Sequence, residues 1–214
     1  MQSVILQRWR SALQVKSFRD KILISAILIG ICVFIAPPLF QFIQEREGPT
    51  LNDFVLAWLP VHDLSYFTFT VLYILILAGV VSLIQNPQLF LRTLQAYIIL
   101  TVLRFVTMLL IPLNPPLNII ELHDPLVQQF FYQQSVTKDL FFSGHTSVLV
   151  LLALAVPSYR LKILLFSGTL VVALMLLIQH AHYTIDVVFA PLFSWLATTL
   201  AKKIPLNVGT TASN

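Results

Sequence analysis

Six stretches of apolar sequence, each near the length that crosses a bilayer, constrain this chain more than any other feature. A hydrocarbon core of ~30 Å takes about 20 apolar residues in a helix. Such stretches lie near residues 21–43, 64–84, 91–112, 140–157, 161–179 and 183–201. Only 10% of the residues are charged, whereas soluble domains carry about 25%. The sequence therefore predicts an all-α fold, a six-helix transmembrane bundle that occupies residues 21–204 as one domain.

The basic residues predict how this bundle is oriented. Ten of them lie on the tails and on the even-numbered loops between the spans. These are Arg8, Arg10, Lys16, Arg19, Lys21, Arg92, Arg160, Lys162, Lys202 and Lys203. Only Arg46 and Lys138 lie on the odd-numbered loops. Because basic loops stay on the cytoplasmic side, both termini are expected in the cytoplasm, and the odd-numbered loops on the exoplasmic (periplasmic or lumenal) side.

The two ends of the chain differ in character from the bundle. Residues 1–20 mix apolar side chains such as Val4 and Trp9 with four basic ones at helical spacing. This pattern predicts an amphipathic helix on the anionic inner surface of the membrane, and its continuous apolar face argues against a nucleic-acid partner. Residues 205–214 form a short polar tail. Short tails without a sorting signal favour a bacterial inner membrane over a eukaryotic endomembrane.

The segment QHAHYTID, residues 179–186, places ionisable side chains beside an apolar span. His182 and Asp186 are four residues apart, which puts them on one face of a regular helix. A carboxylate there can accept the imidazole N–H and leave the other ring nitrogen as a base or nucleophile. The same spacing also suits a buried pair that only satisfies its own hydrogen bonds.

The segment FSGHTS, residues 142–147, lies at the outer start of the fourth span. Ser143 is a natural N-cap, and Gly144 allows a ligand to approach the backbone closely. The first N–H groups of a helix and its dipole favour a bound anion such as phosphate. His145 would then stand beside that anion, where it can donate a proton to a departing oxygen. Taken alone, Ser-Gly at a helix start is also ordinary capping.

Arg104 lies inside the third predicted span, well away from both of its ends. It lies eight residues before Pro112, or roughly 12 Å below the outer end of its helix. A guanidinium keeps its charge in proteins, so at that depth it needs an anionic partner or a polar cavity. An arginine facing a helix-start anion site and two histidines has the composition that phosphoryl transfer requires.

Three segments resemble one known family. Ser-Gly-His followed by His-x-x-x-Asp resembles the phosphatidic acid phosphatase type 2 superfamily. The longer matches, KDLFFSGHT, HAHYTIDV and LRFVTMLLIPL, are similar to the sphingomyelin synthase branch of that superfamily. They extend over about residues 104–188 and agree with the branch in order, spacing and predicted membrane side.

The resemblance implies a role for each matched residue. His182 would be the nucleophile that forms a phosphohistidine, and Asp186 would orient it. His145 would protonate the leaving group and later deprotonate the acceptor. Arg104 and the turn at 143–144 (Ser-Gly) would hold the phosphate. Asp139, His180 and Tyr183 also match family positions and are candidates for supporting places around the site.

Three details qualify the resemblance. On a regular helix His180 and His182 project about 200° apart, so they share a face only if the helix starts between them. Lys138 and Thr137 stand where the branch has glycine and cysteine, which puts a cation near the entrance. The Lys-x6-Arg-Pro element of the phosphatase branch is not evident, which disfavours a simple phosphatase. The acceptor stays open: a lipid alcohol such as ceramide or diacylglycerol, or water.

The sequence thus predicts a membrane-embedded lipid phosphotransferase of the sphingomyelin synthase-like type. It would pass the head-group phosphate of a membrane phospholipid to a lipid alcohol, without a cofactor or metal. The alternative is hydrolysis, as a lipid phosphate phosphatase or a phospholipase C-type enzyme. The spacing of His180 and His182 argues against a zinc hydrolase, and the lack of visible inverted repeats argues against a transporter. The sequence leaves the oligomeric state and the head group open.

Overall fold

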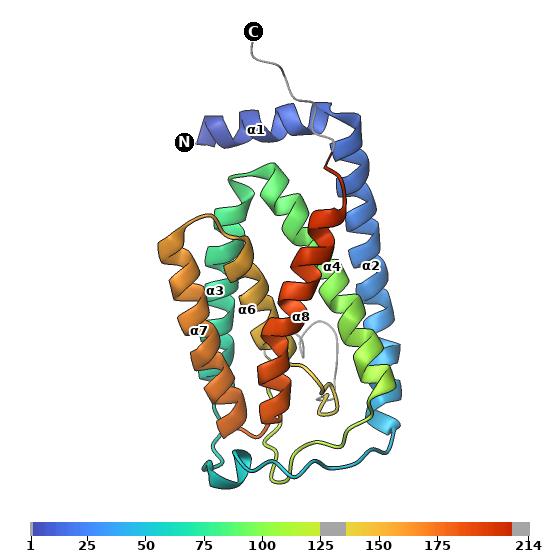
Figure 1. Ribbon diagram of the computed structural model, residues 1–214, viewed down its shortest axis with the longest axis vertical. Helices are drawn as coiled ribbons and strands as arrows, with labels where there is room; N and C mark the ends of the chain where they lie inside the picture. The colour runs from blue at the N-terminus through green and yellow to red at the C-terminus, as the bar shows by residue number, and fades with distance from the viewer. Residues whose placement is uncertain (1, 125–135, 207–214) are drawn as a thin grey trace.

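The computed structural model describes residues 2–124 and 136–206, and its regular structure there is entirely helical (Figure 1). The seven α-helices of this part are α1 (Gln2–Gln14), α2 (Lys16–Glu45), α3 (Ser65–Ile84), α4 (Pro87–Leu110), α6 (Gly144–Ala155), α7 (Tyr159–Ile178) and α8 (Thr184–Lys203). A single 3-10 turn, η1 (Leu56–Trp58), lies in the loop between α2 and α3. The predicted all-α fold is confirmed. Most of the predicted polar tail, from residue 207 on, lies outside the described residues.

Five of these helices, α2, α3, α4, α7 and α8, are long and apolar enough to cross a membrane. The chain is therefore an integral membrane protein. The fourth predicted span, 140–157, is the exception, because it is helical only over Gly144–Ala155. Its 12 residues cover about 18 Å, which is too short for a hydrocarbon core of ~30 Å.

The segment before α6 explains how so short a helix fits into the bundle. Leu140 and Phe142 precede it and are 2% and 0% exposed. Irregular backbone is tolerated at membrane depth when protein encloses it. The start of α6 thus lies inside the bundle, below the ends of its neighbours, which is the feature that positions the site.

The short helix α6 is the centre of the packing, with α3, α4, α7 and α8 around it. One of its faces joins α3 and α7 in an apolar core that includes Leu72, Leu152 and Val172. Another joins α4 and α8 through Leu100, Leu151 and neighbouring residues. In contrast, α2 packs against α4 at the edge of the bundle and buries little of its surface (Figure 1).

Helix α1 lies across one end of the bundle (Figure 1). The Trp9 indole N–H donates to the carbonyl oxygen of Ile84 at 2.8 Å. Trp9 also packs in a cluster with Leu91 and Leu206, so the beginning of the chain and the end of α8 share this end. The starts of α6 and α8, which carry both motifs, lie toward the other end (Figure 1). Which end faces the cytoplasm stays a prediction of the charge distribution.

Candidate active site

His182 lies in the turn between α7 and α8, not on a helix. Helix α7 ends at Ile178 and α8 begins at Thr184. The expectation that His182 and Asp186 share the face of one regular helix is therefore wrong. They meet because Asp186 is in the first turn of α8 and its carboxylate reaches back toward the turn. The His182 Nδ1–H donates to Asp186 Oδ2 at 3.2 Å.

His180 causes the chain to turn here. Its φ of 53° is left-handed, and it follows the last turn of α7 at the position where helices commonly end in this conformation. The N–H of His180 donates to Leu177 and that of Ala181 to Leu176, each at 3.0 Å, which is a Schellman motif. The helix thus starts after both histidines rather than between them. The His180 ring turns to the loop after α4 and donates Nδ1–H to Leu117 at 3.0 Å.

Asp186 is fully buried and connects three parts of the site. Its Oδ2 accepts the Tyr183 N–H at 3.0 Å in addition to the His182 imidazole. Its Oδ1 accepts the Phe141 N–H, and its carbonyl oxygen accepts the Ser143 N–H, both at 3.0 Å. The carboxylate therefore holds the start of α6 as well as the histidine. The sequence predicts only the contact with the histidine, because hydrogen bonds to distant backbone leave no local pattern.

The Asp186 carboxylate also determines which nitrogen of His182 is free. A carboxylate only accepts hydrogen bonds, so the proton of a neutral His182 is on Nδ1. The Nε2 atom then carries the lone pair. This atom is buried and has no hydrogen-bond partner among residues 2–124 and 136–206. The ring as a whole is 0% exposed.

Residues 136–143, which we call the strap, lead into α6 without regular structure. Ser143 ends the strap as the N-cap of α6, and its Oγ accepts the Thr146 N–H at 3.4 Å. Phe141 has a φ of 89°, a conformation that costs a non-glycine residue about 1–3 kcal/mol. Its hydrogen bond to Asp186 holds it there. The strap thus has a fixed shape at the point where it meets the site.

Arg104 on α4 lies directly against Gly144. A Cβ atom on residue 144 would be 1.3 Å from Arg104 Nη1 and 2.5 Å from its Cζ. Glycine at this position leaves room for the guanidinium itself, beside the first turn of α6. The sequence reasoning predicted a close approach at Gly144, but by a bound ligand.

Asp139 on the strap is the ionic partner of Arg104. The Arg104 Nη2 donates to the carboxylate and also to the carbonyl oxygen of Asp139, the latter at 3.3 Å. The two side chains are 14% and 21% exposed. Since α4 ends at Leu110, Arg104 is six residues from the helix end, or about 9 Å, shallower than the 12 Å expected. A charge at that depth needs such a partner.

His145 lies between these groups. Its ring centroid is 6.1 Å from that of His182 and 5.6 Å from that of Phe69, both edge-on. Its Nδ1 is buried and has no hydrogen-bond partner in the part of the chain that the structure describes. Arg104, His145 and His182 are therefore neighbours in the fold, although they come from α4, α6 and the turn before α8.

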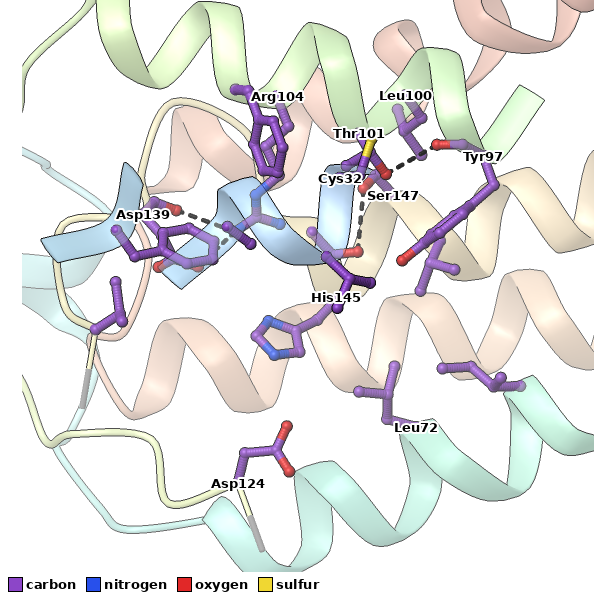
Figure 2. Close-up of a pocket in the computed structure, with 18 of the residues that line it drawn as sticks. Cys32, Leu72, Tyr97, Leu100, Thr101, Arg104, Asp124, Asp139, His145 and Ser147 are labelled. Carbon is purple, nitrogen blue, oxygen red and sulfur yellow. Dashed lines mark hydrogen bonds and ion pairs between the residues drawn. The ribbon is translucent and has the colours of Figure 1, made fainter. Parts of the chain in front are cut away.

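A cavity of about 480 Å³ opens beside His145, between α2, α3, α4 and α6. Figure 2 shows His145, Arg104, Asp139 and Asp124 toward one end of it. The rest of the lining is mostly apolar and includes Cys32, Phe40, Leu72, Tyr97, Leu100 and Phe105. His182, Ser143 and Asp186 do not line the cavity. All three residues are fully buried.

The loops that follow α2 and α4 hold the turn before α8 in place. The Tyr183 hydroxyl donates to the Asn114 carbonyl at 2.9 Å and accepts the Leu51 N–H at 3.1 Å. Tyr183 therefore supports the site as an anchor and points away from the cavity. Asp53 accepts the backbone N–H of Thr184 at 2.6 Å and its hydroxyl at 3.0 Å, so it caps α8 from the loop between α2 and α3.

The environment of Asp53 stabilises its charged form. Burial raises the pKa of this carboxyl, but hydrogen bonds from Thr184, Leu56 and Val55 outweigh that effect and hold the pKa below its ordinary value. Asp53 is not predictable from the sequence, because nothing within its own loop indicates a partner more than a hundred residues away.

No group of three or more His, Cys, Asp or Glu side chains within residues 2–124 and 136–206 is arranged to hold a metal ion. The zinc hydrolase alternative therefore has no ligand set in that part of the chain. The ionisable groups of the site are arranged in pairs instead, with His182 on Asp186 and Arg104 on Asp139.

Residues 138–203 match the family model described as PAP2 superfamily C-terminal. The match begins in the strap and ends with α8, so it contains both histidine motifs, whereas Arg104 lies before it. No curated protein matches the chain. This segment of the chain is thus similar to the PAP2 superfamily C-terminal domain.

Proposed function

We propose that this protein is a lipid phosphotransferase in which His182 carries the phosphate between donor and acceptor. The observation that carries the proposal is the state of His182. Its Nε2 lone pair has no hydrogen-bond partner among the described residues, and its Nδ1 is held by a buried carboxylate. A second imidazole is 6.1 Å away, measured between ring centroids. A nucleophile, its orienting group and an acid–base group in contact are the arrangement that covalent catalysis uses.

In the first step, Nε2 of His182 attacks the phosphorus of the donor lipid. The N–P bond forms while the bond from phosphorus to the lipid oxygen breaks. His145 gives a proton to that oxygen, so that the lipid leaves as a neutral alcohol. Asp186 stabilises the positive charge that develops on His182.

In the second step, an acceptor hydroxyl attacks the phosphohistidine. His145 now takes the proton of the hydroxyl as the new P–O bond forms and the N–P bond breaks. His182 returns to its neutral form, and His145 is again protonated for the next donor. Atoms and charge balance over the two steps, and no third reactant is needed.

Arg104 and the start of α6 supply the charge neutralisation that phosphoryl transfer depends on. The guanidinium is held at the first turn of α6 by Asp139 and by the room that Gly144 leaves. The helix dipole adds to this positive field. Because His182 is fully buried and does not line the cavity, entry of the phosphate requires side chains around His182 to move.

The walls of the cavity support a lipid as the second substrate. Apart from its polar end, the lining is mostly apolar. It is formed largely by α2, α3 and α4, three of the five helices long and apolar enough to cross a membrane. An acceptor such as ceramide or diacylglycerol can place its hydroxyl at His145 while its chains remain among apolar side chains. This is the sphingomyelin synthase-like form of the reaction, with the site proposed on the exoplasmic side.

Hydrolysis is the second candidate, because the same superfamily contains phosphatases. In that form water replaces the lipid alcohol in the second step, and His145 deprotonates it in the same way. Arg104 would still bind the phosphate, and His182 would still be the nucleophile. The two forms differ in the acceptor alone.

The test uses the purified chain in lipid nanodiscs with phospholipid donors labelled at the phosphate. A short incubation followed by quenching should leave label on the protein, stable in base and lost in acid, as expected of a phosphohistidine. His182→Asn should abolish both this label and transfer, whereas His62→Asn, at an exposed histidine of an outer loop, should change neither. Transfer that persists in His182→Asn would refute the mechanism.

Added ceramide or diacylglycerol separates the two candidates. For the transferase, a labelled lipid product appears in proportion to the added acceptor. For the hydrolase, a water-soluble phosphate compound is released at a rate that does not depend on the acceptor.

A further inference from the structure

Gln44, near the end of α2, is bonded to the strap in a way that no part of the mechanism above uses. Its Oε1 accepts the backbone N–H groups of Thr137 and Lys138 at 3.0 and 3.3 Å. Its Nε2 donates to the Thr137 hydroxyl at 2.8 Å. One side-chain amide thus holds two successive residues of the strap.

A neighbouring contact strengthens this attachment. The Lys138 ammonium donates to the carbonyl oxygen of Arg46 at 2.6 Å, and the Arg46 guanidinium donates to the Leu109 carbonyl at the end of α4 at 2.8 Å. The end of α2, the strap and the end of α4 are therefore joined in one hydrogen-bonded set. Lys138, which stands where the sphingomyelin synthase branch has a glycine, thus has a structural partner.

The strap carries Asp139 immediately after the two residues that Gln44 holds. Asp139 in turn holds Arg104 through its carboxylate and its carbonyl oxygen. At the other side, the strap is held at Phe141 and Ser143 by Asp186. Asp139 is thus located between two attachment points, one on α8 and one on α2.

The attachment on α2 differs in kind from the one on α8. Helix α8 packs against α4 and α6 within the bundle, whereas α2 packs on α4 and α1. Only 6% of the residues in the most apolar stretch of α2 are buried. The cavity separates α2 from α3 and α6, and five of its lining residues are on α2. The same helix therefore forms one wall of the cavity and holds one end of the strap.

From this connection we propose that Gln44 is a positioning residue for the phosphate site. It places Asp139, and through it Arg104, so that the phosphate is bound with full strength only while α2 is docked against the bundle. The proposal rests on the proposed function in taking Arg104 as the phosphate-binding group. Gln44 itself does not touch the substrate.

The test compares three variants on the same helix. Gln44→Leu removes the hydrogen bonds at nearly unchanged volume. Gln44→Glu keeps oxygen acceptors for both N–H groups and can also accept the Thr137 hydroxyl proton. Gln41→Leu is the matched control, since Gln41 is exposed one turn earlier and bonds only to Glu45 among its described contacts.

The first measurement is hydrogen exchange in peptides that cover residues 136–143, and it does not depend on activity. Exchange should be faster in Gln44→Leu and close to the unmodified chain in Gln44→Glu and Gln41→Leu. Unchanged exchange in Gln44→Leu would overturn the proposal. Because this measurement needs no turnover, its result stands even if the chain transfers no phosphate, which would instead refute the proposed function.

The second measurement is the division between KM and kcat in the transfer assay. Loss of one or two net hydrogen bonds to the strap should raise KM for the phospholipid donor about tenfold, with a smaller change in kcat. Gln44→Glu should have a KM close to that of the unmodified chain. In combination with Asp139→Asn, Gln44→Leu should add little, since both act through Arg104. Equal loss of kcat in Gln44→Leu and Gln44→Glu with KM unchanged would contradict a positioning role.

Discussion

Gly144→Ala is the substitution that most directly tests the arrangement of the phosphate site. The added Cβ would be 1.3 Å from Arg104 Nη1, whereas ordinary contact begins near 3.4 Å. The guanidinium must therefore move by about 2 Å, and misplacement of a catalytic group by 1 Å can cost about 100-fold in rate. We expect kcat/KM for phosphate transfer to fall at least about 100-fold.

The same substitution should leave the fold intact, which separates an effect on the site from an effect on folding. Gly144 does not have a positive φ, so alanine can adopt its backbone conformation. Where the conformation is compatible, Gly→Ala stabilises a protein by about 0.4–1 kcal/mol through the unfolded state. The atom in conflict is the end of a long side chain that can rotate away. The thermal midpoint in detergent should therefore change little.

The assay is transfer of labelled phosphate in nanodiscs, with the melting curve of each variant measured beside it. Gly30→Ala is the control, because a Cβ at Gly30 meets nothing within 4 Å, and it should retain full activity. In an Arg104→Ala background, Gly144→Ala should cause almost no further loss, since its effect passes through the arginine. A Gly144→Ala variant with unchanged kcat/KM, or one with a large additional loss in that background, would refute the reasoning.

Two further predictions concern the carboxylates that hold the turn before α8. Asp186→Asn keeps the size of the side chain but removes its charge and no longer fixes the tautomer of His182. We therefore expect kcat to fall on the order of 10³–10⁴-fold, as for the corresponding change in catalytic triads. Rapid-quench detection of the phosphohistidine should show that it forms more slowly, and a normal rate of formation would contradict the role of Asp186. For Asp53, the pKa in the folded chain lies below the unfolded value, which is about 3.9. Its contribution to stability is therefore complete above that pH and is lost as pH falls through the lowered folded pKa. Melting curves between neutral and acid pH should show this loss in the unmodified chain and a smaller one in Asp53→Asn, and equal acid sensitivity of the two would count against the Asp53–Thr184 cap.

The helices were the most predictable part of this structure. Apolar stretches of span length predicted the five long helices, because a bilayer requires both the length and the composition. The fourth span was harder, since its apolar letters continue through 140–143 although the backbone there is irregular. Leu140 and Phe142 are surrounded by protein. Hydropathy alone does not distinguish an irregular segment buried in protein from a helix that faces lipid.

The residue types of the candidate site were predictable, and so was their position at one end of the bundle. Their local geometry was not. Spacing placed His182 and Asp186 on one helix, whereas the left-handed backbone at His180 ends α7 and moves His182 into a turn. The partner of Arg104 was required by its depth, yet nothing in the order of residues identified Asp139. That choice depends on where the strap passes the side of α4.

The sequence by itself determined that the chain is a membrane-embedded helical protein and which side chains are available for chemistry at one end of it. Those conclusions follow from the cost of placing charge and unpaired backbone in hydrocarbon, which is a property of composition and length. Only the tertiary structure decided that α6 is short and that Gly144 makes room for a guanidinium. It also decided that Gln44, on α2, holds the strap, and that Asp53, in the loop between α2 and α3, holds the start of α8. These contacts join residues far apart along the chain, so they depend on how the helices pack and leave no periodic pattern in the sequence.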